Sequence, residues 1–304
     1  MNLSNLLQIA REISDTVSLK VKNTQSLGNY IGTIGMSGDQ TKVGDQTVEN
    51  ELKNIVPIIL KKYNINNYWL VSEETGQLMV GEINENSDGI FLIIDPIDGS
   101  NNLRPHGTPK PFVGFSIAIG TLNDLFSDGK FSAVSAGVVR DIFHDETYWT
   151  IKGRGSHLEN ISLVSSPVTD LSDTVLGVSL DRMGEKLQKN FDLGIYDLLL
   201  NTRFQRRLGL SSLDLCRVAT GDYDVHVSLN GDIKVHDIAA VKMIIEEAGG
   251  IVELYKDNKL VNNEKWLLEL FKKGNQGIKD IKFSLIAAGN KDLLEKVKKY
   301  LKLV

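Results

Sequence analysis

The spacing of apolar residues in the first part of the chain predicts two amphipathic helices separated by a polar segment. Apolar side chains recur at helical spacing through residues 2–22 and again through residues 45–63. Residues 23–44 are rich in Gly, Ser, Thr and Asn, so we expect a loop or a hairpin there. Asp45 stands where the second helix should begin and is a candidate N-cap.

Short apolar runs that are typical of buried strands follow the second helix. Two such runs, at 69–72 and 89–94, each end at acidic residues. Pro96 should end the second strand, because proline cannot donate a ladder hydrogen bond in a central strand. The segments 115–119, 133–139 and 147–151 are strand-like, are separated by turn residues, and predict an antiparallel sheet.

The pattern changes again beyond about residue 169, where predicted strands at 175–180 and 284–288 alternate with predicted helices. We therefore expect two halves, an N-terminal α+β half at 1–170 and a C-terminal α/β half at 171–304. The helices predicted in the second half are 187–200, 212–220, 237–247 and 291–301.

The composition is that of an ordinary globular protein, with 304 residues of which 41% are hydrophobic and 24% charged. The formal net charge is −5 and no long basic run occurs, so we expect no nucleic-acid partner. The single cysteine, Cys216, rules out an internal disulfide and a cysteine-based metal site. Neither a signal peptide nor a bilayer-spanning apolar run is evident, so we expect no membrane association and a cytoplasmic location.

Residues 95–100, with the sequence DPIDGS, carry the clearest chemical signal. Asp95 and Asp98 offer carboxylate oxygens for a hard cation at the end of a buried strand. Ser100 is a candidate N-cap of a helix that begins at Asn101, and the free N–H groups of that helix would bind a phosphate. For an isolated motif of this kind, a solvated turn would be the better interpretation.

Two further acidic positions favour a metal site. Glu73 follows the first apolar run, and Asp237 opens a predicted helix. Together with Asp95 and Asp98 they place four oxygen donors at strand ends or helix starts. Such donors suit Mg²⁺ or Mn²⁺ better than Zn²⁺, which prefers Cys and His ligands.

The order of these motifs resembles the inositol monophosphatase superfamily of metal-dependent, lithium-sensitive phosphatases. The resemblance rests on the acidic pair at 73–74, DPIDGS at 95–100 and HDIAA at 236–240. The loop SGDQT at 37–41 is most similar to that of archaeal members, which resemble both inositol monophosphatases and fructose-1,6-bisphosphatases. The resemblance implies an α/β (α+β) fold, namely a layered αβαβα sandwich with its site in a cleft between the halves, and a homodimer.

By this resemblance, two or three Mg²⁺ ions, with Mn²⁺ as a possible substitute, would activate water to hydrolyse a phosphate monoester. Glu73 and Asp95, helped by the carbonyl of Ile97, would hold the first ion. Asp95, Asp98 and Asp237 would hold the second ion. Most of these ligands fall in the N-terminal half, and Asp237 falls in the C-terminal half.

The resemblance also implies the remaining catalytic roles. A weaker third ion would involve Glu73 and Asp45, although a plain helix cap is an equally open interpretation of Asp45 and the two roles are compatible. Asp39 and Thr41 would be partners of the metal site on a loop that closes over it. The hydroxyl of Ser100, paired with a carboxylate, would orient the attacking water.

The same comparison implies contacts with a small phosphorylated sugar or inositol. The turn of Asp98, Gly99 and Ser100 would bind the phosphate through the N–H groups of the last two residues. Gly209 and Ser211 would contact hydroxyl groups of the substrate.

A second phosphate on the substrate would need a cation of its own. Lys234 and Arg104 are the two candidates, and a solvated lysine is an equally open interpretation of Lys234. Arg104 lies in a proline-rich stretch at 103–111 that is longer than the usual family loop.

The leading prediction is therefore a Mg²⁺-dependent phosphatase that acts on inositol monophosphate, fructose 1,6-bisphosphate or both. A 3′(2′),5′-bisphosphate nucleotidase of the same superfamily stays open, because it shares all the metal motifs. A dehalogenase-type phosphatase is disfavoured, since its nucleophilic aspartate lies in a D-x-D motif and the spacing here is D-x-x-D. A non-catalytic regulatory homologue is disfavoured as well, because no predicted metal carboxylate is lost.

Overall fold

The structure, a computed structural model, describes residues 2–34, 40–180, 184–261 and 263–303. In this part of the chain the first of two large sheets contains eight strands, which are β3 (Tyr68–Ser72), β4 (Gly76–Val80), β5 (Ile90–Asp98), β6 (Gly114–Thr121), β7 (Ala136–Asp141), β8 (Glu146–Ile151), β9 (Ser156–Leu158) and β10 (Ile161–Ser162). Their order in the sheet is β10-β9-β8-β7-β6-β5-β3-β4. The antiparallel run from β5 to β10 confirms the sheet that the alternating segments predicted.

The parallel pair β3 and β5 positions the acidic motifs. Its register pairs Ser72 with Ile94, so both strands reach the same edge of the sheet and Glu73 emerges beside Asp95. Strand β5 continues through Pro96 to Asp98, so the prediction that proline ends this strand is wrong. The register with β6 shifts between Asp95 and Asp98, and at such an irregularity the missing N–H of proline is tolerated.

The second sheet is built from the C-terminal part of the chain. Its six strands in the described residues are β11 (Val175–Val178), β12 (Phe204–Arg206), β13 (Val225–Lys234), β14 (Ile251–Lys256), β15 (Lys259–Leu260) and β16 (Lys282–Ala288). They follow the order β12-β11-β13-β16-β14-β15. Strands β11 and β16 lie at predicted positions, whereas β13 and β14 were not predicted.

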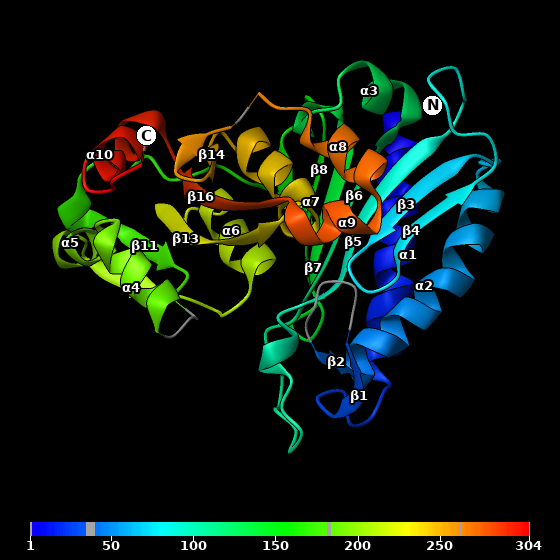
Figure 1. Ribbon diagram of the computed structural model, residues 1–304, viewed down its shortest axis with the longest axis horizontal. Coiled ribbons are helices and arrows are strands. Elements are labelled where there is room, and N and C mark those ends of the chain that lie inside the picture. The colour runs from blue at the N-terminus through cyan, green and yellow to red at the C-terminus, as the bar shows by residue number, and fades with distance from the viewer. Residues whose placement is uncertain (1, 35–39, 181–183, 262, 304) are drawn as a thin grey trace.

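Helices cover both sheets and fill the space between them (Figure 1). The described helices are α1 (Leu3–Lys22), α2 (Val43–Lys62), α3 (Leu122–Ser127), α4 (Glu185–Asp192), α5 (Ile195–Asn201), α6 (Ser211–Ala219), α7 (Val235–Glu247), α8 (Trp266–Lys273), α9 (Asn275–Asp280) and α10 (Lys291–Lys298), with 3₁₀ turns η1 (Ser100–Asn102), η2 (Phe131–Ala133) and η3 (Leu171–Asp173). Apolar residues of α1 and α2 pack on the outer face of the first sheet. Those of α6, α7 and α8 pack between the sheets, and those of α5 and α10 pack on the outer face of the second sheet. This order of layers confirms the predicted αβαβα sandwich.

A glycine divides the helix that was predicted at 187–200 into α4 and α5. Gly194 has φ +96, and a Cβ atom at this position would lie 2.0 Å from the carbonyl oxygen of Tyr300. Only glycine fits this left-handed position and close backbone contact, so the continuous helix is not formed.

The structure also corrects two predicted helix caps. β1 (Tyr30–Ile34) and β2 (Gln40–Lys42) form the expected hairpin, and α2 then begins at Val43. Asp45 therefore lies in the first turn of α2 rather than at its N-cap, and its carboxylate accepts the backbone N–H of Lys42 at 2.8 Å. Ser100 opens the turn η1 and does not cap it, since the residue before η1 is Gly99.

One apolar core joins the two sheets. It includes Phe91 and Ile93 from β5, Val241 from α7 and Phe283 from β16, all of which are almost fully buried. The predicted boundary at residue 170 falls between the last strand of the first sheet and the first strand of the second. None of the described helices is long and apolar enough to cross a membrane.

Candidate active site

A cavity of about 650 Å³ is lined by residues of both sheets and of the helices that follow their strands. Most of the predicted site residues lie in its wall: Glu73, Asp95, Ile97, Asp98, Gly99, Ser100, Arg104, Gly209, Ser211, Lys234 and Asp237. Thr41 and Asp45 are described by the structure but are not part of this wall. Asp39 lies outside the described residues.

Backbone geometry brings four carboxylates to the cavity. Glu73 follows β3, Asp95 and Asp98 belong to β5, and Asp237 lies in the first turn of α7. Asp95 and Asp98 are buried. Asp98 also accepts backbone N–H groups from the first turn of α6, at 3.3 and 2.5 Å, so one side chain joins the two halves of the chain.

Burial and neighbouring carboxylates raise the proton affinity of Asp95, Asp98 and Asp237. Burial, followed by the charges of Glu73, Asp98 and Asp237, raises the pKa of Asp95 well above its usual range. Burial and the charge of Asp237 raise the pKa of Asp98 to about 7, although N–H groups of α6 partly oppose this shift. Anionic oxygens that repel one another in a buried site are stabilised by a bound cation, so the donor set fits a hard divalent ion.

Two basic side chains contact Glu73 in the structure. The Nζ atom of Lys234 lies 2.8 Å from Glu73 Oε1, and Nε2 of His236 lies 3.6 Å from the same oxygen. His236 Nε2 is also 3.5 Å from Asp237 Oδ1. Burial alone would raise the pKa of Glu73, but His236 and then Lys234 lower it below its usual range. Lys234, a candidate for binding a distal phosphate, is thus placed at the carboxylate end of the cavity.

The carboxylates surround the cavity without forming a closed coordination sphere. Within the described ranges, no three His, Cys, Asp or Glu side chains converge as metal ligands do. At this end of the site the ammonium group of Lys234 supplies positive charge instead.

Glu49 of α2 holds the turn that carries Glu73, and it was not among the predicted site residues. Its buried carboxylate accepts hydrogen bonds from the hydroxyls of Ser72 and Thr75 and, at 3.3 Å, from the N–H of Glu74. An acidic residue between the apolar positions 48 and 52 of an amphipathic helix was the signal that could have identified it.

Glu74 connects strand β2 to this turn. Its carboxylate accepts a hydrogen bond from Thr41 Oγ1 at 3.4 Å. Burial, followed by the charges of Glu73, Asp45 and Glu49, raises the pKa of Glu74 to about 8. Thr41 and Asp45 therefore reach the carboxylate cluster through Glu74, behind the wall of the cavity.

The predicted phosphate turn is held from two sides. Gly99 has φ +83, and a Cβ there would lie 2.9 Å from the Leu210 side chain, so this position requires glycine. The ammonium group of the buried Lys42 donates to the carbonyl oxygens of Ser100 and Leu103. The hydroxyl of Ser100 forms no hydrogen bond with any residue that the structure describes.

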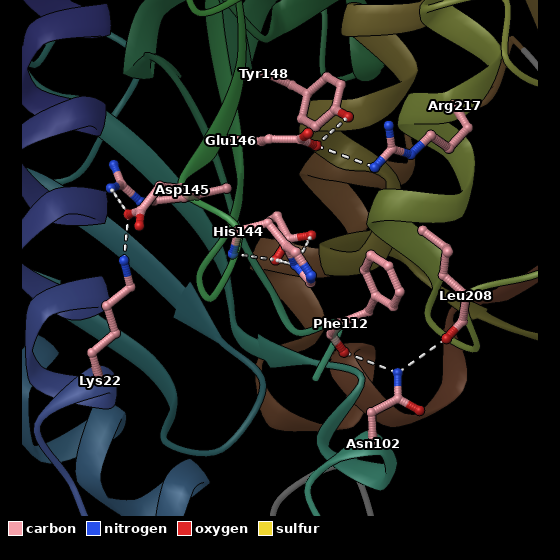
Figure 2. A network of polar contacts seen from close by, with 11 residues as sticks. Lys22, Asn102, Phe112, His144, Asp145, Glu146, Tyr148, Leu208 and Arg217 are labelled. Carbon is pink, nitrogen blue, oxygen red and sulfur yellow. Dashed lines mark hydrogen bonds and ion pairs between the residues drawn. The ribbon is translucent and has the colours of Figure 1, made fainter. Parts of the chain in front are cut away.

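A second turn, which carries Gly209, faces the first. Figure 2 shows the Asn102 side chain donating to the carbonyl oxygens of Phe112 and Leu208, at 2.9 and 3.1 Å. The buried carboxylate of Asp214 accepts the N–H groups of Leu208 and Gly209, at 2.8 and 3.1 Å. Asn102 thereby ties the two turns together, and Asp214 holds the second turn. Neither was among the predicted site residues. Asn102 acts through Leu208, which is distant in the sequence, whereas the partners of Asp214 lie only a few residues before it.

The far wall of the cavity was also missed. It contains Ser179 beyond β11, Ser228, Asn230 and Asp232 of β13, and Lys282 at the start of β16. Polar and apolar residues alternate along β13, which is the usual sign of a half-buried strand, and its polar positions line the cavity.

Comparison with known proteins now decides the family. Residues 3–277 match the group described as the inositol monophosphatase family. The chain belongs to this family. It is therefore a phosphoric monoester hydrolase, and the family to which it belongs consists of metal-dependent phosphatases.

Similar proteins align with most of this chain. The fructose-1,6-bisphosphatase/inositol-1-monophosphatase of Methanothermobacter thermautotrophicus is 29% identical over 302 residues, covering 98% of this chain and 95% of that protein. The bifunctional NADP phosphatase/NAD kinase of Methanococcus maripaludis is 30% identical over 264 residues, which are 82% of this chain but 43% of that longer protein. The crystal structure of an inositol monophosphatase-fructose 1,6 bisphosphatase matches with a TM-score of 0.70 at 22% identity, covering 97% and 98% of the two chains.

Proposed function

We propose that this phosphatase hydrolyses inositol monophosphate and fructose 1,6-bisphosphate with the help of bound Mg²⁺, for which Mn²⁺ can substitute. The observation that carries the proposal is the meeting of four carboxylates and the Gly99–Ser100 turn at one cavity. The substrate pair is that named for the Methanothermobacter relative, which matches this chain from end to end.

Glu73 and Asp95, with the Ile97 carbonyl, are assigned to one cation, and Asp95, Asp98 and Asp237 to a second. The oxygen chemistry of these ligands and the raised pKa values of Asp95 and Asp98 support this assignment. When bound, the cations supply positive charge that stabilises the leaving alkoxide and acidifies a water molecule. A third cation, near Glu73 and Asp45, stays a prediction, because Asp45 lies behind the cavity wall.

The chain's own groups then bind and orient the phosphate ester. The N–H groups of Gly99 and Ser100 are assigned to phosphate oxygens. The Lys42 ammonium, which donates to the carbonyl oxygen of Ser100, supports this assignment by fixing the turn. The Ser100 hydroxyl lies in the cavity wall, where it is free to orient a water molecule. Thr41 adjoins Glu74. The role of Asp39 in a closing loop stays a prediction.

Substrate hydroxyls are assigned to the turn of Gly209 and Ser211, which faces the phosphate turn across Asn102. Arg104 lies at the exposed rim of the cavity. Lys234 pairs with Glu73, so its contact with a substrate would be with a phosphate close to the carboxylates. We also expect the inhibition by Li⁺ and the homodimer that are typical of the family.

A second candidate function is removal of the 2′-phosphate of NADP. It is favoured by the Methanococcus relative, whose name includes an NADP phosphatase. This reaction is chemically close to that of a bisphosphate nucleotidase, since both release a phosphate from an adenosine ribose. The chain spans less than half of that relative, so no kinase activity is inferred.

A panel of phosphate esters assayed with Mg²⁺ tests the proposal. Inositol 1-phosphate and fructose 1,6-bisphosphate should have the highest kcat/KM, ahead of NADP⁺ and adenosine 3′,5′-bisphosphate. A preference for either nucleotide by tenfold or more would replace the substrate assignment with the second candidate. The absence of phosphate release from every ester would overturn both.

A further inference from the structure

Strands β13 and β16 place two lysines side by side in the cavity wall. The antiparallel register pairs Lys234 with Lys282, and paired residues project from the same face of a sheet. Both side chains line the cavity. The Lys234 side chain forms an ion pair with Glu73 at 2.8 Å, whereas the side chain of Lys282 has neither an ion pair nor a hydrogen bond with any residue in the described ranges.

Neutral polar groups accompany Lys282 on the far wall. Ser179, Ser228 and Asn230 line the same cavity. The Ser228 side chain is fully buried, and its hydroxyl has no hydrogen-bond partner among the described residues. Asp232 lines this wall as well and already takes part in another interaction. One cavity thus holds a buried hydroxyl without a partner and a cation without a counter-ion, which are groups expected of an anion subsite.

We propose that Lys282 binds a second phosphate of the substrate while the first lies at the carboxylates. The inference rests on the proposed function, since it presumes a substrate with two phosphoryl groups. Lys282 belongs to the second sheet, whereas the phosphate turn follows β5 of the first sheet, and both line the cavity. A bisphosphate that spans the cavity would thus have each end neutralised by different groups.

The two cations considered from the sequence fit this role less well. Lys234 neutralises Glu73. If Lys234 bound a distal phosphate instead, the Glu73 carboxylate would lose its ion pair. Arg104 is exposed on the rim, where an ion pair contributes little to binding. Lys282 is half-buried and unpaired, so a charge-assisted hydrogen bond to phosphate would form there with less competition from water.

The test compares substrates that carry one phosphate with substrates that carry two. In Lys282→Met, kcat/KM for fructose 1,6-bisphosphate should fall by about tenfold or more, while kcat/KM for inositol 1-phosphate should stay unchanged. Lys282→Arg should restore most of the loss. Lys279→Met is the matched control, because Lys279 is exposed and is not part of the cavity wall, and it should leave both values unchanged.

Equal loss for both substrates, or no loss for either, would overturn the assignment of Lys282. If the parent enzyme hydrolyses neither substrate, the proposed function fails, and calorimetric binding of fructose 1,6-bisphosphate in Mg²⁺ then tests Lys282 by itself. A dissociation constant about tenfold weaker in Lys282→Met would support the subsite. Equal dissociation constants for the parent and the variant would exclude it.

Discussion

Among single residues, Asp98 shows how structural and chemical roles are combined in one side chain. It accepts the N–H groups of Ser211 and Ser212 and so anchors the start of α6 on the first sheet. It also faces Asp237, and burial together with that charge raises its pKa to about 7. The free protein therefore holds these carboxylates at an electrostatic cost that a bound cation relieves.

These raised pKa values predict that the metal-free protein loses stability as pH rises from 5 to 8. Asp95 and Asp98 have pKa values above those of the unfolded chain, which are about 4. Their folded forms bind protons that the unfolded chain has released, so protonation favours folding at low pH, and this contribution is lost as pH passes through about 7. His236, whose pKa is raised by Glu73 and Asp237 against the effect of burial, acts in the same direction.

The measurement is the melting temperature with Mg²⁺ and with EDTA at pH 5 and at pH 8. Stabilisation by Mg²⁺ should be larger at pH 8, where the carboxylates are ionised. Asp98→Asn should reduce the dependence on pH. Equal stabilisation by Mg²⁺ at the two pH values in the parent would contradict this prediction.

The hydrogen bonds of Glu49 lead to a second prediction about a single residue, namely its effect on the Mg²⁺ requirement. Glu49→Ala would leave the Ser72 and Thr75 hydroxyls without their acceptor. We expect the Mg²⁺ concentration for half-maximal activity to rise by about tenfold or more, as for other groups that orient metal ligands. The free energy of unfolding should fall by about 1–3 kcal/mol. Glu51→Ala, on the same helix, is the control. An unchanged Mg²⁺ requirement in Glu49→Ala would show that the turn holds Glu73 in place without the Glu49 carboxylate.

Among the elements, the hairpin β1–β2 and the turn η1 are coupled by Lys42. This side chain leaves β2, is buried, and donates to the carbonyl oxygens of Ser100 and Leu103. The hairpin thereby contacts the phosphate turn through Lys42. In the sequence, Lys42 directly follows Thr41 and lies three residues before Asp45, and both of these are predicted metal-site partners.

Lys42→Met should consequently lower kcat for inositol 1-phosphate by about tenfold, because the phosphate turn loses the cation that fixes it. Lys53→Met, an exposed change on α2, should leave kcat near that of the parent. A Lys42→Met enzyme with the parent kcat would show that η1 keeps its geometry without this contact.

The elements also show what the sequence can and cannot predict. The amphipathic helices and the runs before Glu73 and Asp95 were predictable, because their signals are local in the chain. Strand β13 alternates polar and apolar residues, but it also contains Gly231 and many polar side chains, which are typical of a loop. Its pairing with β16 identifies it as a strand, and the sequence alone does not show that pairing. The roles of Glu49 and Lys42 depend on partners far away in the sequence, and no local pattern contains that information. Asp214 binds the turn just before its own helix, a contact that is local in the sequence and was nonetheless missed.

At the scale of the whole molecule, the site exists only where the two sheets meet. Asp95 comes from the first sheet and Asp237 from the helix that follows the longest strand of the second. Their charges act on one another across the cavity. The shared apolar core between the sheets, which includes Phe91 and Phe283, holds the two contributions in place. Loss of either aspartate should therefore disable the same chemical step.

The rate of phosphate release from inositol 1-phosphate in Mg²⁺ and in excess chelator tests this central claim most directly. The parent should be active only with Mg²⁺. Asp95→Asn and Asp237→Asn should each lower kcat by about a hundredfold or more, and the double variant should lose little beyond either one. Asp257→Asn, an exposed change at a position with φ +50, should match the parent. Full activity in chelator, or a parent-like rate in Asp95→Asn, would contradict metal-dependent hydrolysis at this cavity.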